Sequence, residues 1–425
     1  MKISVIGLWH LGNVISASMA ELGHDVVGID FDDKKIDELR RNKIPVNEQG
    51  LSQMLNKHQS KGRLKFDSNP EAVKNSNVLI IAYDTPVSKN DEVDTTVIFQ
   101  AMKKIRPFLN KNVLVVVMSQ VPVGTTALLS KGFKKIIYCP ENLQLGKAID
   151  CFLNPDRIII GSNDKDSTEM FIKVIKDIKG PRIFMSIASA EMSKHALNAF
   201  LATSLSFTYN ISDLCERVNA DVIDVMKALK SDNRVGNLAY LDTSLGFSGG
   251  TLMRDLRILE SFGKKYKTHI PVVRAVLKTN ELRRKLVVKK LEKVLSQLST
   301  KKITIYGVTY KPGTSTLRQS ISIELISVLK KYRISVSAFD PSADKNEFYK
   351  QTGFHLSDDP YLAAEGSHCL LFITPCPEFL NLNINNLKSK MKKPYIFFDT
   401  RGMFKNIELN ISKTGLNYMR LGKGF

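Results

Sequence analysis

Cysteine, tryptophan and long apolar runs are all scarce in this sequence of 425 residues. Five cysteines, an odd number, are scattered without the spacing of a metal site or a disulfide framework, which points to a reducing compartment. No apolar run approaches the roughly 18 residues that a membrane-spanning helix needs. The first residues read as a strand rather than as a secretory signal. We therefore expect a cytoplasmic protein without a metal site or a membrane segment.

Glycine and proline are also few, at 24 and 15 residues, while 43% of the chain is hydrophobic and 24% is charged. This composition excludes a collagen-like, low-complexity or intrinsically disordered chain. At roughly 100–200 residues per domain, the length predicts two or three domains.

Acidic residues are outnumbered: 42 Asp and Glu stand against 62 Lys and Arg, for a formal net charge of +20. The surplus is spread along the chain as lysine pairs such as Lys34-Lys35 and Lys289-Lys290, and no dense basic arm interleaved with aromatic residues stands out. A solvated, lysine-rich surface is the first interpretation. An anionic small ligand is the second, and nucleic-acid binding is a distant third.

Buried strands alternate with stretches of helical spacing in the first part of the chain. The pattern opens with a strand over Lys2–Ile6, a helix over Leu11–Leu22 and a strand over His24–Asp30. Further apolar strands are expected at Asn77–Ala82, Val113–Met118, Lys135–Cys139 and Arg157–Gly161. Runs that are apolar throughout are typical of a parallel sheet covered on both faces.

The alternation of strands and helices in the sequence ends at about Ser189. Ser189 to Val218 has no Pro or Gly and repeats apolar residues at helical spacing, which predicts one long helix, and helices are expected to continue to about residue 298. Strands then return at Lys302–Val308, Ile334–Phe339, Cys369–Thr374 and Ile396–Asp399. We therefore expect two α/β domains separated by a helical middle.

A glycine-rich turn follows the first strand. Gly7 and Gly12 lie where a dinucleotide-binding turn belongs, and Asp30 closes the second strand, where it can accept from a ribose hydroxyl. The middle glycine of that pattern is Trp9, a bulky side chain where the backbone normally approaches a pyrophosphate. These residues alone also fit a tight turn in any α/β protein.

Many further segments follow one another in a recognisable order. They are Pro45–Leu51, Ala82–Pro86, Ser119–Thr125, Pro140–Leu143, Asn154–Arg157, Ala190–Ala202, Arg234–Gly236, Gly246–Asp255, Tyr310–Pro312, Leu317–Arg318 and Asp399–Arg401. With them the chain resembles the UDP-glucose/GDP-mannose dehydrogenase family nearly end to end, most closely its UDP-glucose 6-dehydrogenase branch.

The resemblance implies an α/β fold with two Rossmann-like doubly wound domains joined by a long helix and a helical middle domain. The expected parts are an NAD-binding domain (1–188), a central dimerisation domain (189–298) and a UDP-sugar-binding domain (299–425). The implied enzyme oxidises the primary alcohol of a UDP-sugar twice with NAD, through an aldehyde to a carboxylate, in polysaccharide biosynthesis. A homodimer is implied, and neither nucleic acid nor a membrane is an expected partner.

Four residues match the family's catalytic positions: Glu141, Lys194, Asn198 and Asp255. Lys194 and Asn198 are four apart on the predicted long helix, so both can point at one oxygen that develops negative charge. The plainer interpretations are a solvated lysine for Lys194 and a helix-start carboxylate for Glu141.

The resemblance also implies the binding residues. For the cofactor they are Gly7, Trp9, Leu11, Gly12, Asp30, Thr85, Pro86 and Gln120, and for the substrate they are Arg234, Ser244, Gly246, Gly249, Lys311 and Arg401. The cationic members suit a diphosphate through charge-assisted hydrogen bonds, and Arg234 is expected to reach across the dimer.

Thr251 is the main departure, because it occupies the position of the family's nucleophilic cysteine. A thiol ionises near neutral pH, whereas a threonine hydroxyl needs a strong adjacent base. Other positions have changed as well: Asp84, Gln120, Leu145, Ser248 and Arg254. Cys139, near Glu141 in sequence, is expected to be a buried, inert thiol.

Two hypotheses follow for the function. The first is an NAD-dependent nucleotide-sugar dehydrogenase altered to a two-electron oxidation, since the first hydride transfer needs no cysteine. The second is a catalytically silent protein that binds a UDP-sugar, which Trp9, Gln120, Leu145 and Thr251 favour. A nucleic-acid-binding protein is the third and weakest interpretation of the positive charge.

Overall fold

The computed structural model describes residues 1–85, 93–247, 249–318 and 320–424. The chain divides into two compact units, Met1–Leu197 and Asn198–Phe425. Both are α/β, as the sequence predicts. Short 3₁₀ turns lie at Pro70–Val73, Arg106–Phe108, Pro377–Asn381 and Lys405–Ile407.

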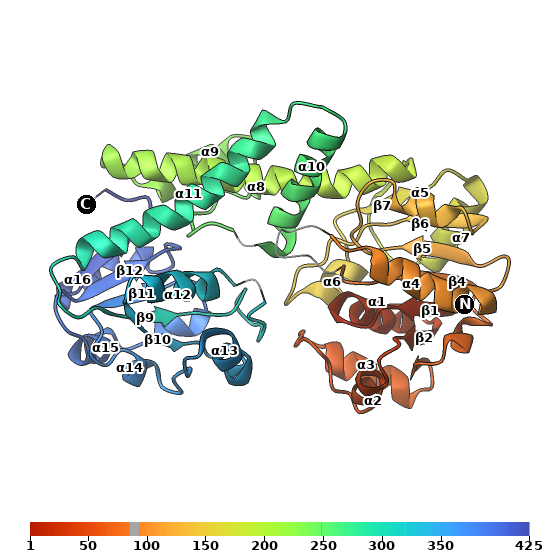
Figure 1. Cartoon of the computed structure of the whole chain (residues 1–425), viewed down its shortest axis with the longest axis horizontal. Coiled ribbons are helices and arrows are strands. Elements are labelled where there is room, and N and C mark those ends of the chain that lie inside the picture. Colours follow the sequence, from red (N-terminus) through yellow and green to blue (C-terminus); the bar gives the residue numbers. More distant parts are fainter. Residues whose placement is uncertain (86–92, 248, 319, 425) are drawn as a thin grey trace. The chain divides into compact units, whose positions relative to one another are not determined.

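The first unit is built on an eight-stranded sheet of order β3-β2-β1-β4-β5-β6-β7-β8 (Figure 1). Its strands are β1 (Lys2–Ile6), β2 (Asp25–Ile29), β3 (Leu64–Asp67), β4 (Val78–Ile81), β5 (Leu114–Val117), β6 (Lys135–Tyr138), β7 (Ile158–Gly161) and β8 (Arg182–Met185). Its helices are α1 (His10–Glu21), α2 (Asp33–Arg40), α3 (Leu51–Ser60), α4 (Thr96–Ile105), α5 (Thr125–Ser130), α6 (Ala148–Leu153) and α7 (Lys165–Val174).

Helices cover both faces of this sheet. Successive residues of one strand belong to two different cores: Val5 packs with α1, α3 and α7, while Ile6 packs with α4 and α5. Because both sides of every central strand are buried, these strands read as unbroken apolar runs. The sheet is doubly wound, as predicted.

One sequence prediction for this sheet needs correction, and two strands were missed. The sheet is not wholly parallel, because β6 and β7 pair antiparallel through Tyr138 and Gly161. Strands β3 and β8 were not predicted. They form the two edges of the sheet, and half of the β8 residues are exposed, so neither carries a continuous apolar run.

The helix α8 (Ile187–Arg217) has 31 residues and crosses the boundary between the two units. It is the long yellow-green helix in Figure 1. It is followed by α9 (Val222–Ser231), a π-helical turn (Gly249–Met253), α10 (Arg254–Lys265) and α11 (Pro271–Val294). The predicted run of helices to about residue 298 is therefore interrupted, since residues 232–247 form neither helix nor strand.

The second sheet is five-stranded and wholly parallel, in the order β10-β9-β11-β12-β13. Its strands are β9 (Lys302–Tyr306), β10 (Ser335–Phe339), β11 (Cys369–Phe372), β12 (Ile396–Asp399) and the unpredicted edge strand β13 (Asn417–Arg420). Its helices are α12 (Ile321–Lys331), α13 (Lys345–Thr352), α14 (Pro360–Ala363), α15 (Ile384–Lys390) and α16 (Glu408–Lys413).

In both sheets the strand order reverses beside the first strand, at β1–β4 and at β9–β11. Ligands of open α/β sheets bind outside the carboxyl ends of the strands at such a reversal. The loops after β1, β4 and β5 and those after β9, β11 and β12 are therefore the places to look for function.

Candidate functional site

The turn after β1 has the geometry that its glycines predict. Gly7 has φ of +95°, and a Cβ on it would lie 2.8 Å from the ring carbon Cγ of Tyr83. A Cβ on Gly12 would lie 1.9 Å from the carbonyl oxygen of Gly7. Any side chain at Gly12 would therefore push α1 away from the strand, so both glycines are required for this close packing.

Asp30 lies at the carboxyl end of β2 and holds this turn. Its carboxylate accepts from the backbone N–H of Leu8 at 2.9 Å and from the Lys35 ammonium at 2.8 Å. Asp30 is buried. Its position suits a ribose hydroxyl, but Lys35 already offsets its charge.

Trp9 immediately precedes the first turn of α1, and its ring meets that of His10 edge-on, with centroids 6.5 Å apart. Leu11 lies in the first turn of α1 and is buried. Its backbone N–H donates to the carboxylate of Asp84 at 3.3 Å. The amino end of α1 therefore already faces a carboxylate from the loop after β4.

Thr85 and Gln120 come together from the loops after β4 and β5. The Thr85 hydroxyl donates to the main-chain carbonyl of Gln120 at 2.9 Å, and both residues are buried. The sequence predictions at Pro86 and Ser248 lie outside the described residues.

Together, these loops form a candidate dinucleotide site. The tight glycine turn, the close approach of α1 and the carboxylate of Asp30 fit the adenosine half of NAD. Asp84 stands at the helix end that would meet the pyrophosphate.

Glu141 and Lys194 are in contact within the first unit. The Lys194 ammonium lies 3.3 Å from a carboxylate oxygen of Glu141 and also donates to the main-chain carbonyl of Glu141. The second carboxylate oxygen accepts from the backbone N–H of Leu143 at 2.6 Å. Lys194 is only 6% exposed, so it is not the solvated lysine of the plainer interpretation.

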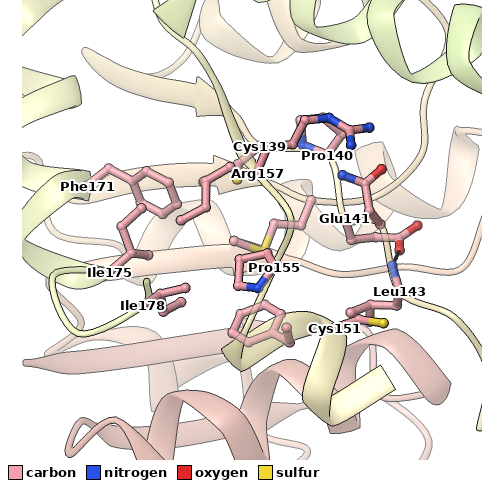
Figure 2. A pocket seen from close by; sticks show the side chains of 14 residues that line it. Cys139, Pro140, Glu141, Leu143, Cys151, Pro155, Arg157, Phe171, Ile175 and Ile178 are labelled. Atoms are coloured by element: carbon pink, nitrogen blue, oxygen red, sulfur yellow. Dashed lines mark hydrogen bonds between the residues drawn. The ribbon is translucent and has the colours of Figure 1, made fainter. Parts of the chain in front are cut away.

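Figure 2 shows an apolar pocket beside Glu141, lined by Cys139, Phe171 and Ile175 among others. Its volume of about 50 Å³ is too small for a sugar nucleotide. Cys139 is buried, and burial raises the pKa of its thiol to about 12. The residue is buried as predicted, and all five cysteines are free.

Asn198 and Asp255 form the corresponding pair of the second unit. The Asn198 amide donates to the Asp255 carboxylate, and both side chains are buried. Asp255 lies in the first turn of α10, whereas Asn198 lies on α8 one turn after Lys194. The pair is therefore desolvated and fixed in orientation, as a catalytic site requires.

Thr251 lies in the π-helical turn before α10, and its side chain is near enough to the Tyr310 phenol to influence the pKa of that phenol. Burial raises the pKa of Tyr310, although Thr251 and the nearby Arg254 oppose the shift. A phenol with a raised pKa keeps its proton near neutral pH and is a poor base for the threonine hydroxyl.

A larger pocket of about 250 Å³ opens in the second unit. Its lining includes the loops after β9, β11 and β12, with Lys311 and Arg401 as its two cationic residues, and Ser244 and Gly246 also line it. The Ser244 hydroxyl is 2.7 Å from that of Tyr209. Four of the predicted substrate residues are thus brought together.

Buried carboxylates shape the turns around this pocket. Asp340, at the end of β10, accepts from the backbone N–H groups of Val308 and Thr309 at 2.7 and 2.9 Å. Asp399 accepts from the N–H groups of Arg401 and Gly402 at 3.0 and 2.7 Å. Because Asp340 occupies the backbone donors after β9, an anion in this pocket would depend on the cationic side chains.

Arg234 and Gly249 are not among the residues that line this pocket. The Arg234 side chain is 89% exposed and pairs with Asp232 at 2.8 Å, on the loop after α9. Gly249 begins the π-helical turn that contains Thr251.

Sequence reasoning missed the pairing of His10 with Glu48. The buried Glu48 carboxylate lies 2.8 Å from His10 Nε2 and accepts from the backbone N–H groups of Gly146 and Ala148 at 2.9 and 3.0 Å. It thus ties the start of α1 to the loop beyond Glu141. The one available signal was a glutamate inside the family segment Pro45–Leu51.

We expect Glu48→Gln to lower the free energy of unfolding by about 1–3 kcal/mol near neutral pH, because an amide accepts these bonds less strongly. Burial opposes ionisation of Glu48, but the bonds from His10, Gly146 and Ala148 outweigh it and hold the pKa below its usual value. The stabilisation is therefore complete above the ordinary glutamate pKa and is lost as pH falls below it. Urea denaturation of both proteins should show the difference shrinking below about pH 4; a constant difference would contradict the prediction.

Within the part of the chain that the structure describes, no helix combines the length and apolarity needed to cross a bilayer. The same residues contain no cluster of three or more His, Cys, Asp or Glu side chains suited to a metal ion.

Three consecutive parts of the chain match the domains of one family. Residues 1–179 match the NAD binding domain of the UDP-glucose/GDP-mannose dehydrogenase family, residues 188–282 its central domain, and residues 304–406 its UDP binding domain.

Individual relatives agree along the whole length. The UDP-glucose 6-dehydrogenase TuaD of Bacillus subtilis is 32% identical, over 99% of this chain and 93% of its own. The UDP-glucose 6-dehydrogenase of Rhizobium meliloti is also 32% identical, over all of both chains. Among solved structures, a UDP-glucose dehydrogenase from Pyrobaculum islandicum superposes with a TM-score of 0.87 at 27% identity, covering 100% of this chain and 98% of that one.

Proposed function

This chain belongs to the UDP-glucose/GDP-mannose dehydrogenase family, and from that membership we propose an NAD-dependent UDP-sugar dehydrogenase that performs one oxidation and stops. In the proposed reaction one C–H and one O–H bond of the sugar alcohol break. The carbon gives a hydride to NAD⁺, the oxygen gives a proton to solvent, and an aldehyde or ketone forms with one NADH.

The observation that carries this proposal is the environment of Thr251. A second oxidation by the family route needs a thiol that adds to the aldehyde. Thr251 offers a hydroxyl near Tyr310, a phenol whose pKa burial raises. This pairing supplies neither a nucleophilic anion nor a base to make one.

The first hydride transfer needs only stabilisation of the negative charge on the reacting oxygen. We assign that role to Lys194 and Asn198, two buried donors one turn apart on α8. Glu141 and Asp255 orient these donors through the contacts described above. Glu141 is also the proposed base for water in any slow oxidation of a hydrated aldehyde.

NAD, when bound, accepts the hydride. Gly7, Gly12 and Asp30 would hold its adenosine half, and Thr85 and Gln120 would border its other half. In the second unit, Lys311 and Arg401 would bind the diphosphate of the UDP-sugar, with Ser244 and Gly246 beside the sugar. We place the NAD-binding domain at residues 1–188, the dimerisation domain at 189–298 and the UDP-sugar-binding domain at 299–425.

We further propose a homodimer formed along α8. Phe200, Phe207 and Leu214 are spaced by seven residues, hence on one face of the helix, and are 68%, 46% and 60% exposed. Exposed apolar residues in such a row favour pairing with a second copy. The exposed Arg234 would then exchange its pairing with Asp232 for the partner's substrate pocket.

Leu214→Lys should convert the dimer to a monomer, because it places a charge in the apolar seam. Light scattering after gel filtration measures the mass directly. Leu409→Lys is the matched control, since Leu409 is 73% exposed on α16 and lies outside the seam. A Leu214→Lys protein that keeps twice the chain mass would contradict this interface.

The silent UDP-sugar-binding protein is the second candidate, and the carboxylate of Asp84 at the amino end of α1 favours it. A panel of UDP-sugars distinguishes the two. The dehydrogenase requires NADH formation with at least one sugar that binds. Tight binding of UDP-sugars with no NADH from any of them would establish the silent protein.

A further inference from the structure

The amino end of α1 is an anion site by its construction. The backbone N–H groups of a helix's first turn have no partners within the helix, and the helix dipole adds about half a positive charge there. Residues 10–13 of α1 contain no carboxylate of their own, and Trp9 before them is not a residue type that caps helices. This end therefore attracts a negative group from elsewhere.

Asp84 supplies such a group from the loop after β4. Its carboxylate accepts from the backbone N–H of Leu11 at 3.3 Å, across 73 residues of sequence. The preceding residue, Tyr83, packs against Gly7 so closely that a Cβ on Gly7 would be 3.0 Å from the Tyr83 Cα. The glycine turn thus fixes the backbone that carries Asp84.

We propose that Asp84 competes with the pyrophosphate of NAD for the amino end of α1 and thereby weakens binding of the cofactor. A dinucleotide places its pyrophosphate at this end of the first helix. Both anions need the N–H of Leu11, and at a separation of a few ångströms they repel each other. Asp84 therefore raises the NAD concentration that is needed to fill the candidate dinucleotide site.

Asp30, the other carboxylate of this turn, lacks this effect. Its oxygen accepts from the N–H of Leu8 at 2.9 Å, before the helix begins, so Asp30 leaves the N–H groups of the first turn of α1 to the pyrophosphate. The inference rests on NAD as the cofactor and is independent of which sugar reacts or how many hydrides leave it.

Trp9 makes the test direct, because it is the only tryptophan of the chain and lies in the turn itself. NADH absorbs where tryptophan emits, so NADH binding should quench Trp9 fluorescence, and calorimetry gives an independent dissociation constant. The variants are Asp84→Asn, which keeps the shape, and Asp84→Gly, which removes the side chain. Asp25→Asn is the control: it changes the net charge equally and is exposed at the opposite end of β2.

We expect both Asp84 variants to bind NADH at least about tenfold more tightly than the wild type. The free energy of a tenfold gain is smaller than the full repulsion between two like charges a few ångströms apart near a protein surface. The control should stay within about twofold of the wild type, and the gain should shrink at high salt because salt screens exposed charges. Binding by Asp84→Asn with none by the wild type would also support the proposal. Equal or weaker binding by Asp84→Asn, or binding by neither protein, would overturn it.

Discussion

Lys194→Met should lower kcat by about 10²–10³ while the dissociation constant of the UDP-sugar changes less than about threefold. The ammonium is desolvated and held by Glu141, so its charge is available to an oxygen that becomes negative only in the transition state. Removing a donor of this kind affects the reaction rate far more than ground-state binding. Single-turnover kinetics and calorimetry measure the two quantities separately.

The control for this prediction is Lys176→Met. Lys176 is a lysine of the same unit whose side chain is 70% exposed, and its loss changes the net charge equally. It should leave kcat unchanged. If Lys194→Met instead binds the UDP-sugar far more weakly and turns it over normally once saturated, Lys194 is a substrate-binding residue and the assignment is wrong.

Thr251→Cys should raise carboxylate formation at least about tenfold, because a partly ionised thiol is a strong nucleophile at neutral pH. The thiol adds to the aldehyde, the resulting thiohemiacetal gives a hydride to a second NAD⁺, and water cleaves the thioester and restores the thiol. Arg254, whose charge opposes the raised pKa of Tyr310, is expected to favour a thiolate at position 251 as well. Product mass and NADH yield are the measurements.

Thr251→Ser is the matched control, since it keeps a hydroxyl and removes only a methyl group. It should form no more acid than the wild type. If Thr251→Cys also makes no more acid, the missing thiol is not the only barrier, and the changed residues Gln120 and Leu145 must contribute to the altered chemistry.

The sequence predicts the centre of each sheet better than its edges. Central strands such as β4 and β5 are buried on both faces and appear as four or more consecutive apolar residues. The edge strands β3, β8 and β13 contain exposed positions and lack that signal. The antiparallel pairing of β6 with β7 depends on the path of the chain between them, which no local pattern encodes.

For the candidate site as well, the sequence predicts local features better than long-range contacts. The order of the motifs predicts candidate residues, but their partners lie far along the chain and only the fold brings them together. Thr251 and Tyr310 are 59 positions apart, and Asp84 reaches a helix 73 residues before it. The substitution at Asp84 was visible in the sequence, whereas the N–H that it occupies was not.

The number of NADH molecules formed per UDP-sugar tests the account most directly. The sugar that reacts is supplied as the limiting reagent with excess NAD, and the product is identified by mass. One NADH with an aldehyde or ketone is the predicted result. Two NADH with a carboxylate would contradict it, because they would show that Thr251 does not block the second oxidation.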